Sequence, residues 1–479
     1  MHDAWSLETL ERPLVAVGSH WSHYKGKSYV VVALCRDCES TDATVVYRSL
    51  YCSDDYPRGT VWCRSLTAWH DIVTVATPWP NGAPTKRARF VPLLAPFLAR
   101  IGVVVLGVGG VGRDLVARIV EARVLHAESY SLALDVVALG DSTGVWGAAA
   151  PAAASGSGVL TWTDEALLAA VECKARGAAL ASVAGAAAHN ATLAAFLAAR
   201  ATRCSNALIV VDCSSGSATT APLLAALEAG HSAVLANKVP LAGSQATFDA
   251  FQCHSRRLRC ESTVGAGLPI HATLARLRAS GDTCLRIDGA FSGTLGFIAS
   301  ALSDGVAFSA AVRDARALGF TEPDPRDDLS GVDVGRKALI LARLCGLRIE
   351  SLDDVALEAL FPPALGVASG LRVDDFVARL GELDGGLAAR VAAAQGRGCE
   401  LRYAASVDVA AATIAVGLAE VPRGSALGGL RGSANLVAFR TECHGEAEPL
   451  VVRGAGAGAG VTSTGVLADI VALALNVAR

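Results

Sequence analysis

The chain has 479 residues, of which 52% are hydrophobic and 18% are charged, and its formal net charge is −3. This length predicts two or three domains, and the composition supplies enough apolar side chains for large buried cores. The near-neutral charge and the lack of a basic block in the sequence exclude nucleic acid as the main partner.

The first residues, MHDAWSLETLERP, contain neither a basic n-region nor an apolar h-region, so no signal peptide is expected. The most apolar window, 178–201, is interrupted by His189, Asn190 and Arg200. A membrane span needs about 20 uninterrupted apolar residues, so this window is typical of a buried helix. We therefore expect a cytoplasmic protein with no membrane partner.

Residues 1–75 predict a small β-rich accessory domain, because β-prone runs at 28–34, 43–51 and 59–66 are separated by polar turns. An antiparallel sheet or barrel fits this pattern. The segment 76–98 is rich in proline, glycine and asparagine at its start, and predicts a linker.

Thirteen cysteines are scattered along the chain without a regular spacing, and we expect most of them to be small buried hydrophobes. Cys35 and Cys38 form one C-x-x-C pair, with Cys52 and Cys63 further along. A zinc site is conceivable there, but no second C-x-x-C supports it.

From residue 99 onward, β-type apolar runs alternate with Ala/Leu-rich helical stretches, which predicts βαβ units and a parallel sheet. The expected strands are 101–108, 134–140, 207–215 and 231–237. This is the α/β, doubly wound fold class, and we assign residues 99–259 to it. The mixed segment that follows has a long strand-like stretch at 399–421, and the chain closes on a glycine-rich loop and an apolar helix.

A glycine-rich turn, GVGGVG, follows the first of these strands and opens a helix. Gly107, Gly109 and Gly112 allow the backbone to turn tightly and approach a pyrophosphate, which then lies at the helix N-terminus. With Gly110 and Val111, these residues predict a dinucleotide site. An ordinary tight turn is the alternative.

Asp141 ends the second strand and can accept a hydrogen bond from a ribose 2′-hydroxyl, which favours NAD. No nearby arginine or lysine in the sequence is available for a 2′-phosphate. The choice between NAD and NADP stays open.

Lys238 follows the strand at 231–237 and should emerge at the carboxyl end of the sheet, where ligands bind in open α/β folds. The loop 261–269, ESTVGAGLP, combines one carboxylate with a glycine-relaxed backbone that can turn carbonyl groups toward a hard cation. Its spacing alone favours a plain turn.

The stretch 318–341 crowds acidic residues before a helix that contains Lys337. Ser330 and Asp333 have the spacing of a capping box, and Asp333 can pair with Lys337 four residues later. One interpretation is a capped, salt-bridged surface helix that ends at Gly346. The other is a pocket in which carboxylates hold a substrate ammonium group and the lysine transfers a proton. The helix's predicted buried face is Val334, Ala338, Leu341 and Ala342.

The stretch LGFTEPDPRDDLSGVDVGRKALILAR resembles the signature of homoserine dehydrogenases. The motifs GVGGVG, VDCSSG, LANKVPLA, ESTVGAGLPI, GAFSGTLGFI and RGAGAGAGVTSTGVLADI occur in that family's order, so the resemblance covers about 99–479. It implies reduction of L-aspartate 4-semialdehyde to L-homoserine with NADPH or NADH, toward threonine and methionine. It also implies a Rossmann-type domain completed by 453–479, an α+β catalytic and dimerisation region at 260–452, and a homodimer or homotetramer.

The resemblance also implies roles for individual residues. Lys337 would be the main acid/base residue, and Lys238 would lie at the nicotinamide and the substrate. Substrate binding would fall to Glu322, Asp328 and Asp333, and cofactor contacts to Ser214, Ser215, Gly456 and Gly458. A structural monovalent cation, usually sodium, would be held by Glu261 and the carbonyl groups of Val264, Ala266 and Leu268.

Two residues depart from the family signature. Phe320 replaces a tyrosine, which removes a hydroxyl group near the expected substrate site. Gly335 replaces an alanine, which costs a helix up to about 1 kcal/mol. We expect neither an aspartate kinase segment nor an ACT-type domain, and hence no threonine feedback through such a domain.

The stretch SHYKGKSYVVVAL and the later VVYRSLY are similar to a short, uncharacterised bacterial domain, and no function follows from that similarity. His23, Tyr24, Lys25 and Trp62 either line a binding face or are packed aromatic and flanking residues.

Two further functions are weighed against the dehydrogenase. Aspartate-semialdehyde dehydrogenase needs a nucleophilic cysteine, and Cys213, near the cofactor strands, has no partner histidine in the sequence. A cofactor-sensing binding protein would have lost its catalytic lysines. Lys238 and Lys337 are both present, which favours an active enzyme.

Overall fold

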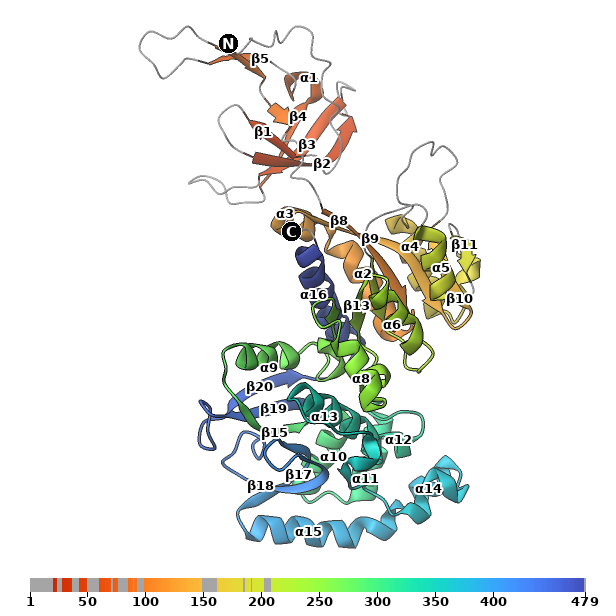
Figure 1. Cartoon of the computed structure of the whole chain (residues 1–479), viewed down its shortest axis with the longest axis vertical. Helices are drawn as coiled ribbons and strands as arrows, with labels where there is room; N and C mark the ends of the chain where they lie inside the picture. Colours follow the sequence, from red (N-terminus) through yellow and green to blue (C-terminus); the bar gives the residue numbers. More distant parts are fainter. Residues whose placement is uncertain are drawn as a thin grey trace. The chain divides into compact units, whose positions relative to one another are not determined.

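The computed structural model divides into two compact units, Met1–Ala99 and Arg100–Arg479, which are described separately (Figure 1). The described residues are 20–23, 28–36, 43–49, 60–69, 72–75, 85–88, 90–92, 99–148, 162–183, 186–190, 192–201 and 208–477.

The first unit contains a five-stranded antiparallel sheet in the order β4-β3-β2-β1-β7, which confirms the predicted β-rich fold. Its strands are β1 (His20–His23), β2 (Ser28–Arg36), β3 (Ala43–Ser49), β4 (Val61–Ser65) and β7 (Phe90–Pro92). Beside it lie α1 (Leu66–Trp69) and a hairpin of β5 (Ile72–Val75) and β6 (Thr85–Ala88). The predicted linker 76–98 is therefore wrong at β6 and β7, because β7 completes the sheet by pairing with β1.

Aromatic rings form the core of this unit. Tyr47 meets Trp69 at 4.9 Å and Tyr29 at 5.2 Å between ring centroids, both nearly edge to face. Trp62 packs against this cluster, as expected of a packed aromatic residue. The other members of the predicted binding face (His23, Tyr24 and Lys25) lie outside the described side chains. Of the candidate zinc ligands, Cys35 and Cys63 are exposed, and Cys38 and Cys52 fall outside the described residues.

The second unit begins with a seven-stranded sheet in the order β11-β10-β9-β8-β12-β13-β14. Strands β8, β12, β13 and β14 run parallel, as the apolar runs predict, and β10 pairs antiparallel with both β9 and β11. The bounds are β8 (Ala99–Leu106), β9 (Leu132–Asp141), β10 (Gly144–Ala148), β11 (Ala186–Asn190), β12 (Ile209–Asp212), β13 (Ser232–Leu235) and β14 (Leu258–Arg259).

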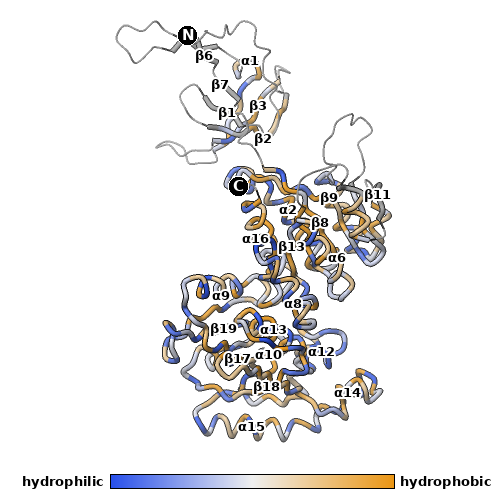
Figure 2. The backbone as a smooth tube through the Cα atoms, in the orientation of Figure 1, coloured by the Kyte–Doolittle hydropathy of each residue, from blue (hydrophilic) through white to orange (hydrophobic). Residues whose placement is uncertain are grey.

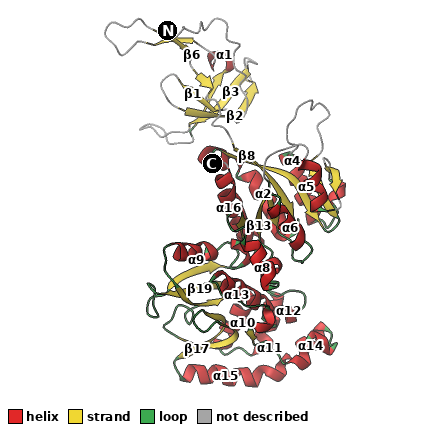
Figure 3. Ribbon diagram, viewed as in Figure 1, coloured by secondary structure: helices red, strands yellow, loops and turns green. Residues whose placement is uncertain are grey.

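Helices accompany the strands of this sheet in the alternating order that the sequence predicts (Figure 3). They are α2 (Gly110–Glu121), α3 (Arg123–Tyr130), α4 (Asp164–Ala175), α5 (Leu193–Ala201), α6 (Thr220–Glu228), α7 (Val239–Ala242), α8 (Gln245–Gln252) and α16 (Ala459–Val477). Helix α16 is long and apolar enough to cross a membrane by length and composition. It contacts α2 and strands β12, β13 and β14, which accounts for its apolar composition as that of a core helix.

A second sheet follows in the order β16-β18-β17-β15-β19-β20. Its strands are β15 (Cys284–Ala290), β16 (Ala356–Leu357), β17 (Cys399–Asp408), β18 (Thr413–Pro422), β19 (Ala434–Thr441) and β20 (Leu450–Ala455). The associated helices are α9 (Ile270–Ala279), α10 (Gly293–Ser303), α11 (Phe308–Ala317), α12 (Pro325–Leu329), α13 (Val332–Leu344), α14 (Val373–Arg379) and α15 (Asp384–Gly396). Short 3₁₀ helices are η1 (Leu180–Ser182), η2 (Glu261–Thr263), η3 (Leu352–Asp354), η4 (Pro363–Leu365), η5 (Val367–Ser369) and η6 (Leu380–Leu383).

Helices α10, α13 and α15 contact β17, and the hydrophobic core lies between them and the sheet (Figure 2). The four residues predicted for the buried face of α13 are all buried. The helix ends at Leu344, two residues before Gly346, whose φ of 97° stops it. Gly335 lies where the side chains of Leu352 and Leu357 approach the helix, since an added Cβ would lie 2.9 and 2.8 Å from them.

The predicted capping box is wrong. Gly331, with φ of 73°, occupies the N-cap of α13, and the helix begins at Val332. The Ser330 hydroxyl accepts from the backbone N–H of Val332 at 3.3 Å. The Asp333 carboxylate turns instead toward two lysines, described below.

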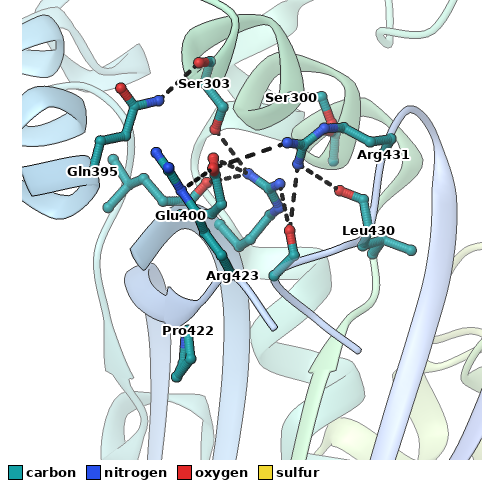
Figure 4. A network of polar contacts seen from close by, with 12 residues as sticks. Ser300, Ser303, Gln395, Glu400, Pro422, Arg423, Leu430 and Arg431 are labelled. Atoms are coloured by element: carbon teal, nitrogen blue, oxygen red, sulfur yellow. Dashed lines mark hydrogen bonds and ion pairs between the residues drawn. The ribbon is translucent and has the colours of Figure 1, made fainter. Parts of the chain in front are cut away.

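A buried ion cluster anchors the connection between β18 and β19 (Figure 4). The carboxylate of Glu400 is 2.9 Å from Arg423, 3.7 Å from Arg402 and 4.0 Å from Arg431. Arg402 is only 2% exposed in its side chain and also donates to the Ser303 hydroxyl at 2.8 Å. One carboxylate thus holds three guanidinium groups, one from β17 and two from the loop that joins β18 to β19.

Candidate functional site

A cleft of about 790 Å³ lies within the second unit, between loops that follow β12 and β13, the N-termini of α2 and α16, and the start of α13. The cleft brings together all of the predicted catalytic and substrate residues with part of the predicted cofactor set. Of the residues predicted from sequence, those lining it are Val111, Ser214, Ser215, Lys238, Ala266, Glu322, Asp328, Asp333, Lys337, Gly456 and Gly458. Gly107, Gly109, Gly110, Gly112, Asp141, Glu261, Val264 and Leu268 are not in its lining.

Asp333 bridges the two predicted catalytic lysines. Its carboxylate lies 2.8 Å from the Nζ of Lys337 and 3.3 Å from the Nζ of Lys238. Burial alone would raise the pKa of Asp333, but the two lysine charges lower it well below its usual range. The helix therefore presents a permanent carboxylate between two ammonium groups.

Lys337 is 9% exposed, so the interpretation of α13 as a simple salt-bridged surface helix is wrong. Its Nζ donates to the carbonyl oxygen of Phe291 at 2.6 Å, at the end of β15. A lysine held by a carboxylate and a carbonyl group keeps one of its three N–H bonds for a further acceptor.

The acidic loop before α13 divides into two parts. Glu322, Asp327 and Asp328 line the cleft, whereas Asp324 is held by Arg326 at 2.7 Å. The backbone N–H of Glu322 donates to Asp328 at 2.8 Å. Burial raises the pKa of Asp328 even though this bond opposes the shift.

Phe320 is not among the residues that line the cleft. Its ring packs against Phe297 at 5.2 Å between centroids, and the residue is 41% exposed. We therefore expect that a hydroxyl group on this ring would not contact the two lysines.

The glycine-rich turn fits a pyrophosphate. Gly107 has φ of 85°, and an added Cβ would lie 2.6 Å from the backbone nitrogen of Ser214. A Cβ at Gly112 would overlap the carbonyl oxygen of Gly107. Gly109, by contrast, faces open space at the N-cap of α2, where no side chain caps the helix. The first N–H groups of α2 are therefore accessible to an anion.

The C-terminal glycine loop meets this turn. An added Cβ on Gly110 would lie 3.9 Å from the Cβ of Ala459, so the N-termini of α2 and α16 come together at the cleft. Gly458 has φ of 107° and open space around it. Gly456 is required for another reason, because a side chain there would overlap Asn435.

The structure corrects the expectation that no basic residue is near Asp141. The Nζ of Lys174, on α4, lies 3.0 Å from the Asp141 carboxylate. Thr143 also donates to Asp141 from its backbone and its hydroxyl, at 2.9 and 2.5 Å. Burial would raise the pKa of Asp141, but these bonds and the lysine charge lower it. The pairing of Lys174 with Asp141 could not be recognised from the sequence, because 33 residues separate the two.

Cys213 is unsuited to nucleophilic attack. Burial raises the pKa of its thiol far above the usual range, and the neighbouring charge of Asp212 raises it further. A thiol held neutral is a poor nucleophile, which argues against an acyl-enzyme mechanism at this site.

The loop predicted to hold a cation has several matching features. Gly265 and Ala266 have φ of 77° and 57°, which turns the backbone sharply. Among the described residues, no N–H group donates to the carbonyl oxygens of Val264 or Ala266. Glu261 accepts at 2.6 and 2.8 Å from the first N–H groups of α9, and burial raises its pKa. Carbonyl groups beside a half-buried carboxylate fit a hard monovalent cation.

Sequence reasoning missed Asp212, Asn237 and Phe291, all of which hold site residues. Phe291 contributes only a carbonyl group, so no side-chain signal could reveal it. Asp212 lies in the motif VDCSSG at the end of β12, and Asn237 lies in the motif LANKVPLA just before Lys238.

A larger hollow of about 1090 Å³ lies over the face of the second sheet and contains none of the cleft's lysines. Small residues such as Ala404, Ala415, Gly417 and Ala438 line it, together with Arg286, Asp288 and Arg440. Helices α10, α13 and α15 pack on β17 elsewhere, as described above.

Two family models match the chain. Residues 269–471 match homoserine dehydrogenase, and residues 19–91 match a protein of unknown function, DUF1653. These matches confirm both resemblances noted in the sequence.

Similar proteins agree with the first match. The homoserine dehydrogenase of Emericella nidulans is 46% identical over 217 residues, which are 44% of this chain and 59% of that protein. That of Saccharomyces cerevisiae is 39% identical over 218 residues, 45% of this chain and 60% of that protein. The chain thus spans about three fifths of the length of these curated relatives.

Solved structures share the fold. A Candida auris protein of unknown function is 30% identical with a TM-score of 0.65, covering 78% of this chain and 98% of that one. A hyperthermophilic archaeal homoserine dehydrogenase in complex with NADPH is 24% identical with a TM-score of 0.58, covering 79% and 98%. The likeness to the archaeal enzyme confirms the predicted fold class.

Proposed function

We propose that this chain, whose residues 269–471 carry the homoserine dehydrogenase domain, reduces L-aspartate 4-semialdehyde to L-homoserine. The observation that carries the proposal is the pair of lysines on one carboxylate, facing a cleft whose other half is a dinucleotide turn. The alternative is a cofactor-sensing binding protein on the same fold.

NADPH or NADH would supply the hydride that reduces the aldehyde carbon. The proton for the aldehyde oxygen would come from Lys337, whose remaining N–H is available after its bonds to Asp333 and Phe291. Lys238 would orient the aldehyde beside the nicotinamide. In the reverse direction, Lys337 would take the proton from the homoserine hydroxyl.

The acidic loop would hold the amino acid. Glu322 and Asp328 line the cleft, and among the described residues no lysine or arginine lies within ion-pair distance of them. Their oxygens can therefore accept from a substrate ammonium group. Asp333 is already shared between two lysines. Its main role would therefore be to position them, with a smaller share in ammonium binding.

The cofactor would be bound by backbone groups at its pyrophosphate and by side chains at its ends. The turn of Gly107, Gly109 and Gly112 would hold the pyrophosphate, with Gly110, Val111 and the loop at Gly458 around it. Ser214 and Ser215 would contact the nicotinamide end. Lys174 beside Asp141 can accommodate a 2′-phosphate. NADP is therefore favoured as the cofactor, whereas the sequence alone favoured NAD.

A sodium ion is proposed in the loop of Glu261, Val264, Ala266 and Leu268, where it would hold the loop in shape without entering the reaction. We further propose a homodimer, or a tetramer of two dimers, in the cytoplasm. The wide hollow on the second sheet, lined by small residues and by Arg286, Asp288 and Arg440, supports an interface on that face.

The test is turnover of L-homoserine by the purified full chain, with NAD⁺ and NADP⁺ compared, and with L-serine as a matched control lacking one methylene group. Reduction of the cofactor with homoserine alone is the expected result. Cofactor binding without any turnover of homoserine would instead favour the sensing protein.

A further inference from the structure

A buried carboxylate lies beneath the cleft at the end of β12. Asp212 is 0% exposed, and its two oxygens accept four hydrogen bonds. One oxygen accepts from the backbone N–H and the hydroxyl of Ser214, at 2.9 and 2.6 Å. The other accepts from the hydroxyl of Thr219 and the amide of Asn237, at 2.6 and 3.1 Å. These bonds fill the acceptor capacity of the carboxylate.

No cation helps to hold this charge. Among the described residues, no lysine or arginine forms an ion pair with Asp212, so neutral donors alone compensate its burial. A buried charge without a countercharge is costly, and a chain gains little stability from it compared with a neutral residue. The arrangement therefore calls for a reason other than stability.

Asn237 connects this carboxylate to the turn that carries Lys238. Its amide nitrogen donates to Asp212 and, at 2.8 Å, to the carbonyl oxygen of Gly216. Its amide oxygen accepts from the backbone N–H of Val239 at 3.0 Å. The side chain is 4% exposed and is held at both ends. Because Lys238 lies between Asn237 and Val239, its backbone is fixed from both sides.

We propose that Asp212, acting through Asn237, is the positioning residue that aims the Lys238 ammonium group into the cleft and keeps the Ser214 loop in register with it. This inference rests on the proposed function for its kinetic consequences. Its structural content, a defined orientation of Lys238 toward Asp333 at 3.3 Å, stands apart from turnover. The Ser214 hydroxyl donates its hydrogen bond to Asp212, so toward a bound cofactor it can act only as an acceptor.

The matched pair of variants is Asp212→Asn and Asp282→Asn. Asp282 is also buried and is likewise held by neutral donors, the hydroxyl of Thr441 and the N–H of Cys443, at 2.7 and 3.1 Å. It lies two residues before β15 and outside the cleft lining. Both substitutions replace two acceptors by one acceptor and one donor, so both lower stability, and only the first disturbs Lys238.

Kinetics give the first readout. Asp212→Asn should lower kcat about 10- to 100-fold, the size of loss that a misplacement near 1 Å can cause. In a Lys238→Ala background, at saturating cofactor, the same substitution should lower kcat clearly less than in the native background, because the lysine that it positions is gone and only its hold on the Ser214 loop remains. Equal losses in both backgrounds would overturn the proposal.

Chemical labelling gives a second readout that needs no turnover. The rate at which reductive methylation modifies Lys238, followed by mass spectrometry, should rise several-fold in Asp212→Asn and stay unchanged in Asp282→Asn. An unchanged rate in Asp212→Asn would also overturn the proposal. Should that variant not fold, Asn237→Ala carries the same two tests. If the native chain lacks homoserine turnover, the proposed function has failed, and labelling alone decides whether Asp212 positions Lys238.

Discussion

Replacing Lys174 by alanine should change the cofactor preference of this protein. The lysine Nζ lies 3.0 Å from Asp141, and the two side chains are 21% and 8% exposed. Without the lysine, the Asp141 carboxylate remains charged at the end of β9, where the adenosine ribose binds in this fold. A phosphate brought within about 5 Å of that carboxylate is repelled by about 3 kcal/mol per unit charge at an effective dielectric constant of 20.

The loss of a charge-assisted hydrogen bond adds about 1.5–3 kcal/mol, and solvent screening reduces the total. We therefore expect the Kd for NADPH to rise about 10- to 100-fold in Lys174→Ala, whereas the Kd for NADH changes by less than about 3-fold. Fluorescence titration of the two reduced cofactors measures both values. Lys174→Arg is the control that keeps the charge, and Asp141→Asn should shift the preference the other way. Equal weakening of NADPH and NADH in Lys174→Ala would refute this reasoning.

Three further perturbations test other parts of the structure. Burial raises the pKa of Asp469 to about 7 from 3.8, so the folded chain retains a proton that the unfolded chain releases, and stability falls as pH rises from about 4 to 7. Asp469→Asn should remove this dependence and stabilise the protein at pH 8 by up to about 4 kcal/mol, since one pKa unit is worth about 1.36 kcal/mol. Denaturant titrations across the pH range measure the effect, and parallel pH curves for the two proteins would contradict it. Glu400→Gln should lower the unfolding free energy by about 3–5 kcal/mol, because it leaves buried guanidinium charge unpaired. Glu420→Gln, at an exposed ion pair, should barely change the midpoint of denaturant unfolding. Similar losses in both variants would contradict a stabilising role for the ion cluster. Phe320→Tyr should leave kcat and KM within about 2-fold, because the ring packs on Phe297 outside the cleft, and a large gain in kcat would show that the hydroxyl reaches the substrate.

The parts that the sequence predicted well are those with local signals. Apolar runs located β8, β9, β12 and β13, since a strand buried on both faces must be apolar throughout. The glycine spacing located the turn after β8, where Gly107 and Gly112 have no room for a side chain. The buried face of α13 followed from its helical period.

The parts that failed depend on contacts between distant residues. Asp333 looked like a capping residue because Ser330 precedes it by three positions, yet the Lys238 charge, 95 residues earlier in the chain, helps to draw the carboxylate away. Lys174 was overlooked for the same reason. Strand β7 stood in an apparent linker, because its pairing with β1 lies some 70 residues away in sequence.

The central claim is that Lys337, fixed between Asp333 and the Phe291 carbonyl group, donates the proton to the substrate oxygen. The most direct measurement compares the native chain with Lys337→Met, which keeps the length of the side chain and removes the ammonium group, in homoserine oxidation and in NADPH binding. The account predicts a fall in kcat of about 10²- to 10⁴-fold with an NADPH Kd within about 2-fold of the native value. Native-like turnover in Lys337→Met, or a loss that follows entirely from weakened NADPH binding, would contradict it.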